Sequence, residues 1–172
     1  LTAKAYAEGG RALEAFCAML LEKEHHHPDE KVRKDSGDLL ALLTPIAKAF
    51  LTDNGHIATN ACMQVFGGHG FIKEWGMEQY VRDNRINMIY EGTNTIQSLD
   101  LLGRKVLSNN GATLRKFGKL VAQLVAEEGV NEKMAEFVNP IAYLGDQMTK
   151  FTTEIGFKGF QNPDEVGAAA VD

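Results

Sequence analysis

Apolar residues recur at the three- and four-residue spacing of α-helices along almost the whole chain. The first such pattern covers residues 3–24, where the Gly9-Gly10 pair permits close packing against a neighbouring helix. Residues 25–37 are polar and predict a connector. A longer helical pattern follows, with apolar positions at Leu39, Leu43, Ile46, Phe50, Ile57, Ala61 and Val65.

Thr44 and Pro45 interrupt this second pattern. Proline kinks or breaks a helix interior, but it fits the first position of a helix. Either Thr44 caps a fresh helix that begins at Pro45, or one helix kinks there, and we expect the first. Two adjacent glycines, Gly67 and Gly68, then end the pattern within residues 66–71.

The remainder of the chain is also helical in pattern. A third helix carries Met77, Tyr80, Val81 and Met88, and a fourth runs from Thr93 to Leu107. Residues 108–114 break the chain again, two more amphipathic helices follow, and residues 164–172 resemble the opening of another helix. No segment alternates as a strand does, so the patterns predict an all-α helical bundle.

Composition narrows the class of protein. The chain has 172 residues, 44% apolar and 24% charged, with a net charge of −5 and no Lys/Arg-rich block, which argues against nucleic acid as a partner. No apolar run reaches the roughly 18 residues of a membrane span. We see no signal peptide, and Cys17 and Cys62 lie in apolar patterns as buried free thiols. We therefore expect a cytoplasmic protein.

Three consecutive histidines, His25 to His27, are a candidate for a metal site. Consecutive residues of a helix point in different directions, so these side chains do not converge on one ion. A solvated helix end is the better interpretation, and we assign no metal.

The segment "QVFGGHGF", residues 64–71, offers Gln64, Gly67 and Gly68 as candidate binding residues. Glycines let a backbone approach a phosphate or a flavin, with free N–H groups as donors. The alternative is a helix end and a tight turn, and composition alone favours the turn.

Glu91 stands directly before Gly92, between two helical patterns, in a junction that looks buried on its N-terminal side. A desolvated carboxylate there would have a raised pKa and would act as a general base near neutral pH. The alternative is an exposed glutamate near the start of the next helix. Spacing alone favours this alternative, because glutamate is usually exposed.

A resemblance changes this balance. Residues 46–107 resemble the C-terminal helical domain of the acyl-CoA dehydrogenases, above all in "QVFGGHGF", "YVRDNRI" and "IYEGTNTIQ". The match extends more loosely back to Leu1. Residues 108–172 are similar to the extended tail of large bacterial members, such as the 3-methylmercaptopropionyl-CoA dehydrogenase type. The resemblance implies an up-and-down helical bundle at 1–107 and, at 108–172, the start of an additional C-terminal helical region.

The resemblance also implies chemistry. The glutamate of the "YEGT" motif is the family's general base, so Glu91 would remove the α-proton of an acyl-CoA thioester while FAD takes a hydride from the β-carbon. The backbone N–H of Glu91 would bind the thioester carbonyl. The matching positions for FAD are Gln64, Gly67, Gly68 and Thr93, and those for the substrate are Tyr90 and Gly92. Several relatives carry Gln where this chain has Thr95.

Partners follow from the same resemblance: an electron-transfer flavoprotein or similar acceptor, and a homodimer or homotetramer with shared flavin sites. Segments matching the family's N-terminal helical domain and middle β-domain are absent from this sequence. We therefore expect the chain alone to fold but neither to hold FAD tightly nor to turn over. Two other functions stay open, a non-catalytic helical oligomerisation or interaction module and an acyl-CoA oxidase that uses oxygen.

Overall fold

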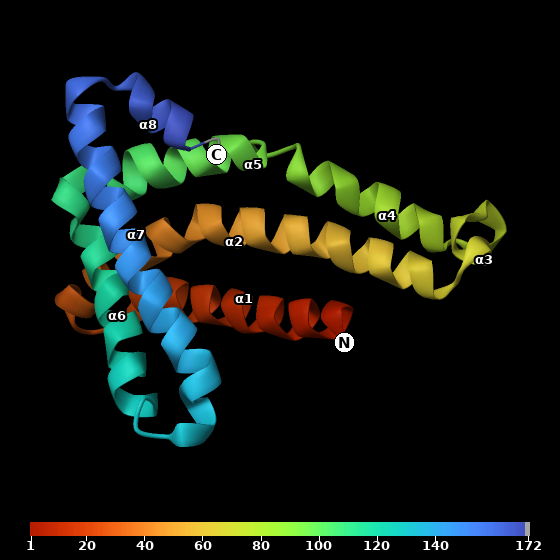
Figure 1. The fold of residues 1–172 in the computed structure, drawn as a ribbon, viewed down its shortest axis with the longest axis horizontal. Helices are drawn as coiled ribbons and strands as arrows, with labels where there is room; N and C mark the ends of the chain where they lie inside the picture. Colours follow the sequence, from red (N-terminus) through yellow and green to blue (C-terminus); the bar gives the residue numbers. More distant parts are fainter. Residues whose placement is uncertain (171–172) are drawn as a thin grey trace. The chain divides into compact units, whose positions relative to one another are not determined.

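The computed structural model describes residues 1–170, which form helices and connecting turns with no strand among them (Figure 1). The prediction of an all-α fold is confirmed. The chain divides into two compact units, Leu1–Ser98 and Leu99–Asp172. This division lies earlier than the end of the helical bundle predicted at residue 107, and the domain boundary stays a prediction. Each unit is described by itself.

The first unit is organised around two long antiparallel helices, α1 (Thr2–His26) and α2 (Glu30–Val65), which lie side by side (Figure 1). Gly10 of α1 is buried, and a Cβ added there would lie 2.8 Å from the Leu51 Cδ2 atom of α2. The expected close packing is therefore present at Gly10, where a larger residue would require the Leu51 side chain to move.

Helix α2 begins earlier than the polar composition predicted. Asp29 is its N-cap, and the side chain accepts a hydrogen bond from the Lys31 N–H at 2.8 Å. Residues 30–37, expected in a connector, form the first turns of the helix instead. The connector prediction is wrong there because Asp29 accepts a hydrogen bond from a free N–H group at the start of the helix and so stabilises that end. A polar composition does not prevent a segment from forming a helix.

Helix α2 also continues through Pro45, so the expected fresh helix start at Thr44 is wrong. The Thr44 hydroxyl donates to the Leu40 carbonyl at 2.8 Å, the helical i−4 bond of a side chain within a helix. Pro45 is buried together with Leu42 and Leu43. Burial of this face outweighs the hydrogen bond that proline cannot make.

Helix α4 (Met77–Arg85) lies back along α2 after a short connection (Figure 1). The chain then reaches the turn at residues 89–93 and a short helix. The bounds of the smaller elements are α3 Gly68–Phe71, η1 Lys73–Trp75, η2 Ile86–Met88 and α5 Asn94–Leu99. The helices predicted after residues 76 and 93 are thereby confirmed.

The second unit begins with a π-helical segment and contains an antiparallel pair, α6 and α7, with α8 packed against α7. Asn109, Asn110 and Gly111 have positive φ angles and form the predicted break. The bounds are η3 Asp100–Val106, η4 Ser108–Gly111, α6 Ala112–Glu128, η5 Glu132–Met134, α7 Ala135–Gln161 and α8 Asp164–Ala169. Helix α8 confirms the helix expected near the end, whose last residues, 171–172, lie outside the described residues.

Few large apolar side chains are buried within the described residues. Those of the first unit are Leu20, Leu39, Leu42 and Leu43, and those of the second are Val106 and Val138. Cys17 and Cys62 are free thiols and only partly buried, so the expected full burial is corrected. Along α2 and α4 many apolar side chains reach the surface, and the candidate site lies among them.

Candidate active site

Glu91 lies in the turn between η2 and α5 and has an unusual backbone conformation. Its φ angle is +57°, and that of Gly92 is +81°. Left-handed backbone is accessible to glycine but costs roughly 1–2 kcal/mol for other residues. Such a residue persists only where its surroundings fix it, and such residues concentrate at functional sites.

Side chains of α2 hold the C-terminal side of this turn. The Lys48 ammonium donates to the Gly92 carbonyl and to the Asn94 Oδ1 atom, each at 2.7 Å. The Asn94 Nδ2 atom in turn donates to the Asp53 Oδ1 atom at 2.7 Å. The turn is thereby tied to a helix more than forty residues earlier in the chain.

The residues after the turn hold it from the other side. The Gln97 Nε2 atom donates to the Glu91 carbonyl at 3.1 Å. The Thr93 hydroxyl accepts the Ile96 N–H at 3.3 Å and so caps α5. A Cβ added to Gly92 would lie 3.0 Å from the Gln97 Nε2 atom. The turn is therefore compact as well as left-handed.

The N-terminal side of the turn is exposed, which corrects the expectation of a buried junction. The exposed fractions of Ile89 and Tyr90 are 48% and 53%, and Glu91 is also exposed. The Tyr90 hydroxyl donates to the Asn87 Oδ1 atom at 2.8 Å. The desolvation expected for the Glu91 carboxylate is not provided by the described part of the chain, because this turn lies on its surface.

The second group of candidate residues lies where α2 ends and α3 begins. Gly67 has φ +61°, and a Cβ added to Gly67 or Gly68 would meet no atom within 4 Å. Gln64 is exposed beside them. The first N–H groups of a helix lack acceptors within the helix. The space beside both glycines is therefore open, although the Gly67 N–H itself donates to the Gln64 carbonyl at 3.0 Å.

The structure does not bring the two groups of candidate residues together. Helix α4 and η2, residues 77–88, separate the segment 64–68 from the turn at 90–93 (Figure 1). Twelve residues of helix span about 18 Å. One chain therefore presents two separate groups of candidate residues.

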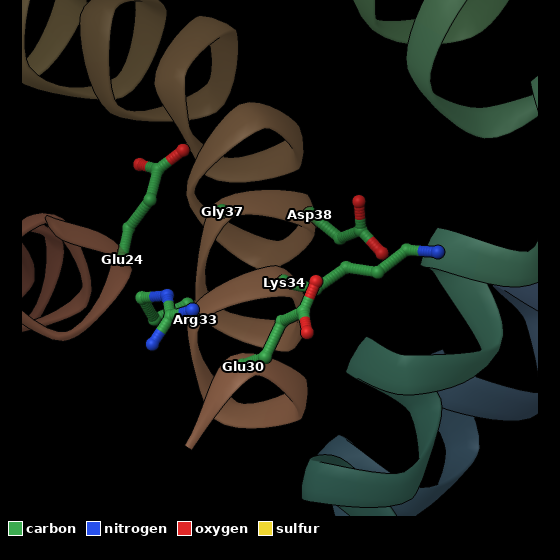
Figure 2. A pocket seen from close by; sticks show the side chains of 6 residues that line it. All are labelled: Glu24, Glu30, Arg33, Lys34, Gly37 and Asp38. Atoms are coloured by element: carbon green, nitrogen blue, oxygen red, sulfur yellow. The ribbon is translucent and has the colours of Figure 1, made fainter. Parts of the chain in front are cut away.

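A hollow of about 480 Å³ lies elsewhere, where α1 ends and α2 begins (Figure 2). Its lining is charged and of both signs, and none of the candidate residues contributes to it. Arg33 there donates to the His27 carbonyl at 2.7 Å. The lining residues are Glu24, Glu30, Arg33, Lys34, Gly37 and Asp38.

Residues 1–170 contain no group of three or more His, Cys, Asp or Glu side chains placed to hold a metal ion. None of their helices has the length and apolar character that crossing a membrane requires.

The residues that support the turn were not among the candidates predicted from the sequence, namely Lys48, Asp53, Asn94 and Gln97. Lys48 and Asp53 belong to a segment that was expected to begin a separate helix. Asn94 and Gln97 lie within the recognised motif and were given no role. The available signal was Asp53, which lies beside the apolar positions Phe50 and Ile57 of α2, where a polar side chain needs a partner. Lys48 lies on the opposite side of the helix and carried no such signal.

Comparison with known proteins gives the family. The family model for the acyl-CoA dehydrogenase C-terminal domain matches residues 2–107. The 3-methylmercaptopropionyl-CoA dehydrogenase of Ruegeria pomeroyi is 41% identical over 127 residues, which are 74% of this chain and 21% of that protein. The broad-specificity linear acyl-CoA dehydrogenase FadE5 of Mycobacterium tuberculosis is 30% identical over 138 residues, 78% of this chain and 22% of that protein.

A butyryl-CoA dehydrogenase of Syntrophomonas wolfei is also 30% identical, over 137 residues that are 80% of this chain and 22% of that protein. The chain thus spans about a fifth of the length of these relatives. The family model covers more than half of the chain, and the turn that carries Glu91 lies within the matched residues. The chain therefore belongs to the acyl-CoA dehydrogenase family and carries its C-terminal domain.

Proposed function

We propose that this chain is part of an FAD-dependent enzyme that oxidises an acyl-CoA thioester to the trans-2-enoyl-CoA, with Glu91 as the general base. The observation that carries the proposal is the left-handed backbone of Glu91 and Gly92, held by Lys48 within the motif that the family shares. Catalytic side chains are often carried by residues with a strained backbone that neighbouring residues hold in place.

Each residue of the turn has its own proposed role. Glu91 takes the proton from the α-carbon, and its backbone N–H donates to the thioester carbonyl as negative charge develops there. The backbone of Gly92 contacts the thioester, and the exposed ring of Tyr90 lines the pocket for the acyl chain. FAD, when bound, would supply the acceptor for the hydride of the β-carbon, while Glu91 would hold the proton from the α-carbon.

Gln64, Gly67 and Gly68 would hold the adenosine and pyrophosphate end of FAD, and Thr93 would contact the flavin. The open space at both glycines supports this assignment. Because α4 separates these glycines from Glu91, we propose that they serve the active site of a neighbouring subunit in a homodimer or homotetramer. Covering of the turn within that assembly would supply the desolvation that Glu91 lacks here.

The proposed electron acceptor is an electron-transfer flavoprotein or a similar protein, and the proposed setting is fatty acid metabolism in the cytoplasm. A second candidate function is a helical oligomerisation or interaction module without catalysis. The exposed apolar side chains of Phe71 and Trp75 favour some protein partner at this face. The two functions differ in whether the protein binds FAD.

The experiment that tests the proposal is an absorbance spectrum of the full-length protein that contains this chain, purified and mixed with FAD. The proposal predicts a retained yellow flavin that bleaches anaerobically on addition of acyl-CoA, whereas the 172-residue chain alone retains none. Hydrogen peroxide release in air would identify an oxidase instead. Absence of bound flavin from the full-length protein would favour the interaction module.

A further inference from the structure

The turn that carries Glu91 is connected to α2 through three partly buried polar side chains, Lys48, Asp53 and Asn94, which we call the clamp. Lys48 contacts both the Gly92 carbonyl and the Asn94 Oδ1 atom at 2.7 Å. Asn94 contacts the Asp53 carboxylate at 2.7 Å through its Nδ2 atom. Partial burial of all three strengthens these charge-assisted contacts, because water competes for them less than at the surface.

The order of charges in the clamp fixes the orientation of the Asn94 amide. The carbonyl oxygen of that amide faces the Lys48 ammonium, which only donates, and its NH₂ group faces the Asp53 carboxylate, which only accepts. A flipped amide would place donor against donor and acceptor against acceptor. The three side chains therefore form a cation–amide–anion row with one stable arrangement.

The clamp acts on the backbone that follows Glu91. The Gly92 carbonyl is bound to Lys48, and the Glu91 carbonyl is bound to Gln97. Rotation of Glu91 to an ordinary negative φ angle would turn the following peptide groups away from these partners. Removal of the clamp therefore weakens the hold on the left-handed conformation, because only the Gln97 contact then offsets its intrinsic cost.

We propose that Lys48, Asp53 and Asn94 are positioning residues that hold the Glu91 carboxylate in place for proton abstraction. This inference rests on the proposed function of Glu91. None of the three is assigned a contact with FAD or substrate, so their removal changes flavin binding and KM less than it changes kcat. Misplacement of a catalytic group by about 1 Å lowers rates by as much as ~100-fold, so the main effect is a fall in kcat.

The first test exchanges the Asn94 amide and the Asp53 carboxylate in the full-length holoenzyme. Asn94→Asp places two carboxylates together and lowers kcat by about tenfold or more. Adding Asp53→Asn restores one donor and one acceptor, so the double variant recovers to within about threefold of the wild type. A double variant no more active than Asn94→Asp would overturn the proposal.

The second test examines the clamp through Lys48 and so does not depend on whether the Asn94→Asp variant folds. Lys48→Met removes the ammonium while it keeps a long side chain, and Lys31→Met is the matched control at an exposed lysine of the same helix. Hydrogen–deuterium exchange of the backbone amides at 91–97 reports the turn directly. The clamp predicts exchange about tenfold faster in Lys48→Met, an unchanged rate in Lys31→Met, and lower kcat in Lys48→Met alone.

The outcomes separate the clamp from the proposed function. Unchanged amide exchange in Lys48→Met would show that there is no clamp. Faster exchange with unchanged kcat would show a structural contact that does not position Glu91, and would overturn the proposal. If the wild-type holoenzyme itself does not oxidise acyl-CoA, the proposed function fails, while amide exchange still decides whether the clamp exists.

Discussion

The carbonyl oxygen of Gly92 accepts a hydrogen bond from the Lys48 ammonium at 2.7 Å, although 44 residues separate the two in sequence. Hydrogen bonds to charged groups contribute about 1.5–3 kcal/mol, which is enough to offset the cost of one left-handed residue. The contact explains how a glutamate keeps a backbone conformation that normally requires glycine. It also makes the geometry of the turn depend on α2.

Position 92 requires glycine for two reasons, its left-handed backbone and the close contact that a Cβ would make. Gly92→Ala places a Cβ at φ +81°, 3.0 Å from the Gln97 Nε2 atom. We expect a loss of about 1–3 kcal/mol in the free energy of unfolding, from strain and crowding together. Chemical denaturation of the chain measures this loss.

Gly9→Ala is the matched control for that experiment. Gly9 lies inside α1, and a Cβ there meets no atom within 4 Å. The same substitution should therefore stabilise the chain by about 0.5–1 kcal/mol, because alanine is the better helix former. Equal effects of the two substitutions would show that the left-handed turn is not under strain.

Gly68 separates a role in cofactor binding from a role in folding. A Cβ added at Gly68 meets no protein atom within 4 Å, and its φ angle is not positive. Gly68→Ala should change the free energy of unfolding by no more than about 0.5 kcal/mol. If the backbone here lies against the pyrophosphate of FAD, the same substitution raises the FAD dissociation constant of the full-length protein by about tenfold.

Fluorescence titration with FAD measures this effect, and Gly9→Ala again serves as the control. FAD affinity that is the same in Gly68→Ala and in the wild type would contradict the assignment of this segment to cofactor binding.

The stability of the chain should fall at alkaline pH through Cys17. Partial burial raises the pKa of the Cys17 thiol above its ordinary value of 9.0. As pH rises above about 9, the unfolded chain loses this proton before the folded chain does, so the free energy of unfolding decreases. Denaturation at pH 8 and pH 10 should show a larger decrease for the wild type than for Cys17→Ala. An equal decrease would exclude this thiol as a cause.

The sequence was sufficient for the fold class, because helical periodicity extends over most of the chain and no strand pattern competes with it. It failed at Pro45 and at residues 30–37, for one physical reason. Local propensity predicted a break in both places, but a cap at Asp29 and burial of Leu42 and Leu43 favour a continuous α2. Tertiary packing outweighs propensity in such cases.

At the candidate site, the motif could be predicted from the sequence but the contacts that support it could not. The Glu91 motif is local in sequence and was recognised there. Its support by Lys48 and Asp53 depends on how α2 lies against the turn, which no local pattern encodes. The exposure of Tyr90 was also missed, because apolar character does not say whether a surface is covered within the same chain.

The measurement that tests the central claim most directly is the rate of flavin bleaching by acyl-CoA in the full-length protein with Glu91→Gln. Glutamine keeps the size of the side chain but removes the base. We predict retained flavin and a rate at least about 100-fold lower than in the wild type, with little change in the control Glu74→Gln, at an exposed glutamate of η1. A rate within about tenfold of the wild type, a difference of only ~1.4 kcal/mol, would show that Glu91 is not the base.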